Sequence, residues 1–229
     1  MTAQGGLRYV YAVCRPFAAA LQAQLTGVAG APPGLLRHHG LVAVVSTVPE
    51  GDFADEPLRD HLEDPEWLAA TARAHQGVID ALTTVTTPLP LGPATVFRDD
   101  SGVRTMMEAR ETYFLQTLDR LEGRVEWGVR VYSPVDPPEK AARAGEEFAR
   151  ILHERLSGRA EDSRLFGTSV QRLLDAAYLV PRADSEEFVE LLDRTKDMAP
   201  EIRVELSGPW AAYSFTEPTA EPTGPAARG

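Results

Sequence analysis

The side chains that could bind a metal ion or attack a substrate are few in this sequence: one cysteine and five scattered histidines. His38 and His39 are adjacent, and on an extended segment neighbouring side chains point to opposite faces, so we expect a poor metal pair. Cys14 lies in a strand-like stretch and is expected to be a small buried side chain. The motifs G-x-S-x-G and H-E-x-x-H do not occur. We therefore predict no catalytic residues, no metal and no cofactor.

Two further groups have simpler explanations than catalysis. Asp99 and Asp100 resemble an acidic metal-binding pair, but with Ser101 and Gly102 they are typical of a turn before a helix. His75 falls on the apolar stripe of a predicted helix, which favours a hydrogen-bonded core histidine over a ligand.

Charge is distributed unevenly along the chain. The net charge is −11, yet residues 1–49 contain no acid, whereas eight acids lie within residues 50–66. An acidic chain without a basic block argues against binding to nucleic acid or to anionic membranes. The acidic cluster is either a solvated surface or a docking surface for a basic partner. For the second reading, the candidate interaction residues are Asp52, Asp55, Glu56 and Glu63.

Hydrophobic periodicity divides the chain into elements of two kinds, which indicates an α+β fold. Strands are expected at 7–14, 41–46 and 125–132, with an interrupted extended segment at 86–97 because of its prolines. A helix should begin at Asp64-Pro65, with Asp64 as the N-cap and Trp67 and His75 on it, and another should cover 103–121. These elements form a predicted first domain, residues 1–134, with helices against one sheet face.

The second predicted domain covers residues 135–216. Helices are expected from 139 to 156 and after Asp184, and strands at 177–180 and 201–207. The pattern of residues 164–176 is ambiguous, and a helix is the interpretation taken. Residues 217–229 are rich in Pro, Thr and Ala and are predicted to be a disordered tail.

An aromatic stretch closes the second domain. Gly208 and Pro209 should end or bend the strand, and Trp210, Tyr213 and Phe215 follow within six residues. Rings of this size each bury roughly 150–250 Å². We expect this segment to dock onto a core near the domain junction and to shape a groove; an ordinary hydrophobic strand end is the alternative.

The compartment can also be predicted. No apolar run approaches the ~20 residues that span a bilayer, and no secretory signal is visible. A single cysteine excludes an internal disulfide, which fits a reducing cytosol. We therefore expect a cytoplasmic protein.

Several motifs occur in an order that resembles one known family. They are Tyr9-Val-Tyr-Ala-Val13, Leu41-Val-Ala-Val-Val-Ser46, Asp64-Pro-Glu-Trp-Leu68 followed by His75, Glu126-Trp127, Ala177-Tyr-Leu-Val180 and Gly208-Pro-Trp-Ala-Ala-Tyr-Ser-Phe215. Together they resemble the gas vesicle protein family GvpL/GvpF over residues 7–216. The chain departs from the family at Pro90-Leu-Gly-Pro-Ala-Thr95, where relatives tend to have Pro-x-Arg-Phe-Gly-Thr, so no role of that loop is transferred.

The resemblance implies two ferredoxin-like α+β units without enzymatic activity. It also implies a protein of gas vesicle assembly that binds the apolar shell protein and other accessory proteins in a chaperone-like or nucleating role. The alternative hypothesis is a small-molecule-binding or enzymatic protein with its ligand in an interdomain cleft near His75 and Trp127.

Overall fold

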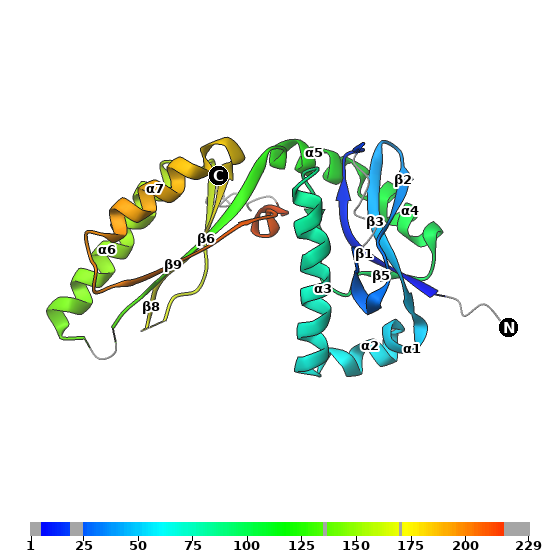
Figure 1. The fold of residues 1–229 in the computed structure, drawn as a ribbon, viewed down its shortest axis with the longest axis horizontal. Helices are drawn as coiled ribbons and strands as arrows, with labels where there is room; N and C mark the ends of the chain where they lie inside the picture. Colours follow the sequence, from blue (N-terminus) through cyan, green and yellow to red (C-terminus); the bar gives the residue numbers. More distant parts are fainter. Residues whose placement is uncertain (1–5, 19–24, 135–136, 170, 218–229) are drawn as a thin grey trace, which may run out of the picture. The chain divides into compact units, whose positions relative to one another are not determined.

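The computed structural model describes residues 6–18, 25–134, 137–169 and 171–217. The chain divides into two compact units, one ending at Gly123 and the other starting at Arg124 (Figure 1). Each unit contains one antiparallel sheet with helices packed on it. The predicted α+β class is therefore confirmed.

The sheet of the first unit has the strand order β2-β3-β1-β4, with β5 also paired to β1. Its strands are β1 (Gly6–Cys14), β2 (Gly34–His38), β3 (Leu41–Pro49), β4 (Leu89–Pro90) and β5 (Val96–Phe97). The two short strands β4 and β5 take the edge next to β1, as the prolines of that segment predict, because proline donates no ladder hydrogen bond. The sequence did not reveal β2.

Helices cover both faces of this first sheet. They are α1 (Glu50–Phe53), α2 (Asp55–Leu62), α3 (Pro65–Thr83), α4 (Asp100–Ala109) and α5 (Glu111–Leu121). On one face, His75 of α3 packs against the rings of Tyr9 and Tyr11. On the other face, α4 and α5 share a core cluster with Val10 and Val13. The unit therefore has three layers, with the sheet in the middle, and the expectation of helices on one sheet face only is wrong for this unit.

Aspartates start two of these helices. Asp64 Oδ1 accepts hydrogen bonds from the backbone N–H of Glu66 and Trp67, at 2.9 and 3.3 Å. Asp99 Oδ1 accepts one from Gly102 N–H at 2.9 Å, and Asp100 pairs with Arg8. Helix capping and an ion pair therefore explain the Asp99–Asp100 pair, and α4 begins at Asp100 where a turn over residues 99–102 was expected.

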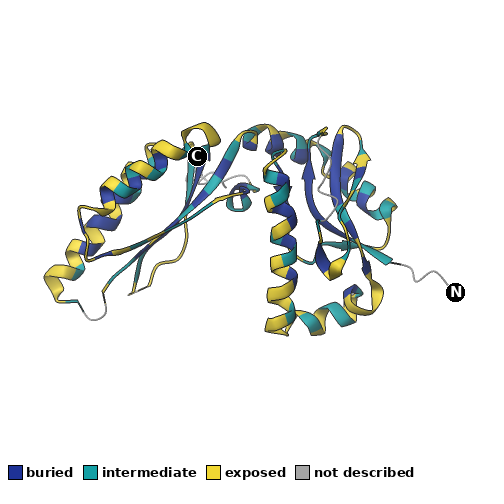
Figure 2. Cartoon of the chain, viewed as in Figure 1, coloured by how far each residue is buried: buried dark blue, intermediate teal, exposed yellow. Residues whose placement is uncertain are grey.

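The second unit has the element order β-α-β-β-α-β, and its strand order is β7-β8-β6-β9. The strands are β6 (Arg124–Tyr132), β7 (Asp162–Leu165), β8 (Arg172–Pro181) and β9 (Arg203–Trp210). The helices α6 (Glu139–Ser157) and α7 (Ser185–Lys196) turn their buried residues toward one sheet face and their exposed residues outward (Figure 2). This is the ferredoxin-like arrangement, and the first unit repeats its strand order.

Two sequence-based assignments are wrong. The strand at 125–132 was predicted to close the first unit, but β6 pairs with β8 and β9 at the centre of the second sheet, so the division falls after Gly123 and not after residue 134. Residues 164–176 are not helical: they contain the end of β7 and the start of β8. Both segments are paired by contacts distant in sequence, which local periodicity does not encode.

The predicted tail lies outside the described residues except for Glu217. Among the residues that the structure describes, no helix is both long and apolar enough to cross a membrane.

Candidate functional site

Among the described residues, α6 and α7 pack on one face of the second sheet, and a hollow of about 340 Å³ lies on the opposite face. Its floor consists of three small residues directly opposite one another, Ala177 of β8, Gly128 of β6 and Ser207 of β9. Phe166, next to the edge strand β7, and Trp210, on the edge strand β9, also line it. These two rings are 46% and 38% exposed. The remaining lining residues are Glu126, Arg130, Asp175, Ala176 and Ser214. We call this site the open-face hollow.

Two glycines permit the close packing of β6 and β9 here. A Cβ atom on Gly128 would lie 2.6 Å from Ser207 Oγ. Gly208 has φ +125°, and a Cβ there would lie 2.7 Å from the Glu126 carbonyl oxygen and 3.0 Å from Trp127 Cε3. Gly208 and Pro209 were expected to end or bend the strand. β9 does not end there: it continues past a register shift to Trp210.

The C-terminal segment docks beside the hollow. Glu126 accepts hydrogen bonds from Ser214 N–H at 2.8 Å and Ser214 Oγ at 2.7 Å. Phe215 is fully buried, and the Arg164 guanidinium lies 5.6 Å from the centre of its ring. Desolvation raises the pKa of Glu126, while the bonds from Ser214 and the charge of Arg164 act in the opposite direction.

The prediction of a docked aromatic segment holds for Phe215, and Tyr213 is half-buried. It is wrong for Trp210, which was expected to be a buried anchor. The chain turns after Trp210, so the ring stays at the sheet edge while Ala211, Ala212 and Phe215 are buried.

The charged side chains near the hollow compensate one another. Asp175 is largely buried and lies 3.4 Å from Arg130 Nε and 2.9 Å from Arg172 Nη1. These ion pairs balance the negative charge of Asp175. The hollow therefore has small residues at the centre of its floor and an ion-paired carboxylate at one end.

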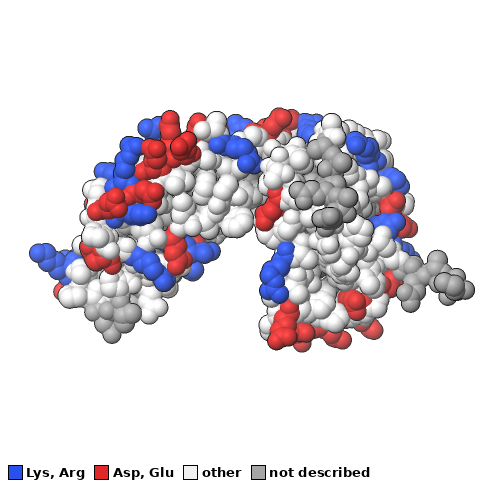
Figure 3. Space-filling view, viewed as in Figure 1, with Lys and Arg blue, Asp and Glu red and all other residues white. Residues whose placement is uncertain are grey.

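A second surface lies on the first unit. The acidic patch, which we define as Asp52, Asp55, Glu56 and Glu63, is exposed at all four positions. Figure 3 shows acidic side chains gathered over the region of α1 and α2. Asp55 and Glu56 lie in the first turn of α2, where a negative charge also stabilises the helix. Trp67 supports this region, since its ring stacks on His61 at 4.8 Å.

The buried titratable groups lie in cores. His75 Nδ1 lies 2.9 Å from Tyr9 Oη, and burial lowers the pKa of His75 to about 4. Burial raises the pKa of the Cys14 thiol to about 12. Trp127 packs in the core of the second unit and donates a hydrogen bond to Ser185 Oγ at 3.3 Å. His75 and Trp127 are thus core residues of separate units.

The expectation that His38 and His39 point to opposite faces is wrong. β2 ends at His38, and the next two residues form a two-residue turn with φ +45° at His39 and +74° at Gly40. Strand alternation stops at a turn, so the two imidazole rings stack face to face, 4.1 Å apart. A residue followed by glycine between two apolar runs is the sequence signal that could have indicated this hairpin.

The fold and these surfaces define a class, namely a two-unit α+β protein whose sheets share the ferredoxin-like strand order. A sequence profile of the gas vesicle synthesis protein GvpL/GvpF family matches residues 7–142 and 137–217. The chain belongs to this family, which supports an accessory role in gas vesicles.

Individual relatives agree. Gas vesicle protein L of Streptomyces sp. (strain CB03234) is 47% identical over 91% of this chain and 92% of its own length. Gas vesicle protein F of the same strain is 26% identical over 91% of this chain and 99% of its own length. The crystal structure of GvpF from Anabaena sp. PCC7120 has a TM-score of 0.76 at 15% identity, covering 93% of this chain and 97% of that one. At that identity the likeness shows the shared fold.

Proposed function

We propose that this protein holds the apolar gas vesicle shell protein during vesicle assembly, without catalysis, by binding an apolar segment of it in the open-face hollow. The observation that carries the proposal is the pair of exposed rings, Phe166 and Trp210, on a sheet face whose floor has small side chains. Family membership supplies the gas vesicle context.

The geometry suits a rod-like apolar segment. Small residues on the floor let a helix approach the sheet closely, and an aromatic residue toward each edge offers apolar area that binding would cover. Each 100 Å² of apolar surface removed from water contributes about 2.5 kcal/mol. A subunit held in this way would be kept from pairing with other copies until it is transferred to the growing shell.

The acidic patch has a separate part in the proposal. Its exposed carboxylates attract basic partners, which are the shell protein or other accessory proteins of the gas vesicle, and so raise the association rate more than the affinity. We also propose that the encounter takes place in the cytoplasm, before the vesicle is complete.

Co-purification with the shell protein tests the proposal. The Phe166→Ala and Trp210→Ala variants should each retain markedly less shell protein than the unchanged chain. Met198→Ala is the matched control, because Met198 is an apolar side chain of the same unit that is 61% exposed and does not line the hollow. Equal retention by all of these variants would overturn the proposal.

A further inference from the structure

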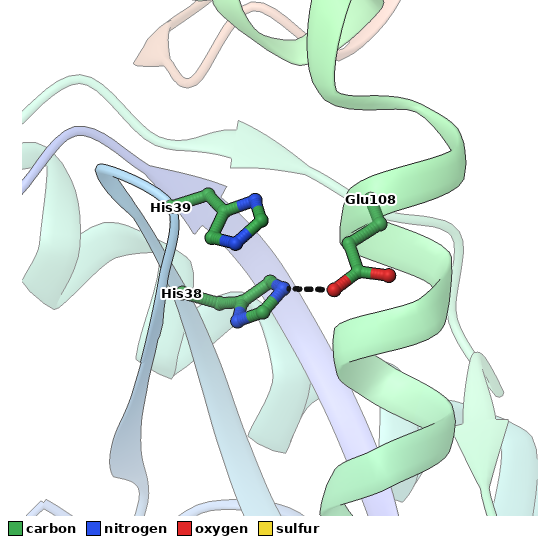
Figure 4. Close-up of side chains that lie close together, drawn as sticks. All are labelled: His38, His39 and Glu108. Atoms are coloured by element: carbon green, nitrogen blue, oxygen red, sulfur yellow. Dashed lines mark hydrogen bonds and ion pairs between the residues drawn. The ribbon is translucent and has the colours of Figure 1, made fainter.

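The β2–β3 hairpin brings two imidazoles against one carboxylate of α4 (Figure 4). His38 Nε2 lies 2.7 Å from Glu108 Oε1, and one ligand atom of each of His38, His39 and Glu108 lies within 4.8 Å of the others. Glu111, at the start of α5, places Oε2 3.6 Å from His39 Nδ1. Two histidines and two carboxylates from three elements therefore meet at one place.

We propose that His38, His39 and Glu108 bind a divalent transition-metal ion of the Zn²⁺ type. Imidazole nitrogens prefer Zn²⁺, Ni²⁺ and Cu²⁺, whereas Mg²⁺ and Ca²⁺ prefer sites made of oxygen atoms alone. Two histidines and a carboxylate with a fourth position open to water or Glu111 form a donor set that tetrahedral zinc sites use.

The distances require a modest rearrangement. Zinc ligands at about 2.0–2.1 Å from the metal lie roughly 3.3–3.5 Å from one another in a tetrahedron. Stacked rings direct their nitrogens in parallel, so the two imidazoles must rotate about their side-chain bonds to converge on one ion. The side chain of His38 is only 16% exposed, whereas those of His39 and Glu108 are 57% and 53% exposed, so most of the rotation falls to His39 and Glu108.

Binding changes the His38–Glu108 contact. The ion takes the place of the hydrogen between Nε2 and the carboxylate; a neutral imidazole then carries its one proton on Nδ1, and a doubly protonated ring releases its second proton to solvent. Because the ligands come from the β2–β3 turn and from α4, the ion joins the hairpin to the helix within the first unit. Since it binds the folded chain, it also raises the melting temperature.

Simple ion pairing is the competing explanation. Protonated His38 and His39 beside Glu108 and Glu111 would form two salt bridges with no affinity for a metal. His61 provides an internal comparison, because it lies 3.8 Å from Asp52 without a second histidine beside it.

The test is calorimetric titration of ZnCl₂ into the full chain, free of any affinity tag and stripped of metal, with Co²⁺ absorption as a second readout. We expect about one equivalent of Zn²⁺ to bind and a visible Co²⁺ band to appear. His39→Asn and Glu108→Gln should each weaken binding by at least about tenfold, since even residues around the ligands contribute 10–100-fold. Asn is chosen because it tolerates the positive φ at position 39.

The control variant His61→Ala should bind like the unchanged chain. Absence of Zn²⁺ binding, or equal binding by His39→Asn and Glu108→Gln, would overturn the proposal. Because two independent ligand variants are compared, misfolding of one does not remove the test, and circular dichroism checks each fold. The result does not bear on the open-face hollow, which lies in the other unit.

Discussion

Gly208 lies directly against the ring of Trp127, so closely that a Cβ at position 208 would come within 3.0 Å of Cε3. The same Cβ would meet the Glu126 carbonyl oxygen at 2.7 Å, and φ at this glycine is +125°. The relationship links the core of the second unit to the open-face hollow, because it fixes the path of β9 just before Trp210.

Gly208→Ala should therefore destabilise the second unit. A positive φ costs an L-residue roughly 1–3 kcal/mol, and the contact with the Glu126 backbone adds to it. Urea denaturation measures the loss. The matched control is Gly77→Ala in α3, where a Cβ meets nothing within 4 Å and should instead add about 0.5–1 kcal/mol. Unchanged stability of Gly208→Ala would show that the backbone relaxes freely here.

Phe215 and Trp210 should separate stability from binding. Phe215→Ala removes a fully buried ring and should cost about 3–5 kcal/mol. Trp210→Ala should cost clearly less, because its ring is 38% exposed, yet it should impair shell-protein binding. Chemical denaturation of both variants beside the co-purification measures the two effects. A larger stability loss for Trp210→Ala than for Phe215→Ala would contradict the assignment.

His75 should make the first unit less stable in acid. Its pKa is about 4 in the folded chain and 6.5 as a free side chain, so the unfolded chain binds more protons between these values. Stability from this group is complete above pH 6.5 and is lost as pH falls toward 4, by on the order of 2–3 kcal/mol.

Denaturation of the unchanged chain and of His75→Gln at pH 7 and pH 5 checks this. The variant should lose less stability between the two values, whereas His61→Ala should behave like the unchanged chain. If His75→Gln loses as much stability between pH 7 and pH 5 as the unchanged chain, the loss comes from other titratable groups.

Charge reversal should reveal whether the acidic patch steers a partner. Replacing all four residues of the acidic patch with lysine should slow association with a basic partner at low salt. It should have little effect at high salt, because salt screens the attraction. Stopped-flow or surface binding measures the rate. A control with equal charge change reverses four exposed acids of the second unit: Glu146, Asp184, Glu186 and Glu201. Equal slowing by both sets would mean that only net charge matters.

Capping residues and hydrophobic periodicity predicted several helices and strands correctly. Asp64 and Pro65 placed the start of α3 correctly, and alternation identified β6. Alternation shows only that one face of a strand is buried, so it could not tell which sheet β6 joins.

The site was harder to predict for the same reason. Phe166 and Trp210 are far apart in sequence and come together on one sheet face only through the pairing of β7 with β8 and of β6 with β9. The direction of the His39 side chain was also predicted wrongly. His39 has a left-handed backbone conformation in a turn, so strand alternation does not apply to its side chain.

Site-specific photocrosslinking tests the central claim most directly. A benzophenone amino acid replaces Phe166 in one variant and Met198 in the other, and each is irradiated together with the shell protein. We predict a covalent adduct with the shell protein from position 166 and little or none from position 198. Adducts of equal yield at both positions, or none at position 166, would contradict binding in the open-face hollow.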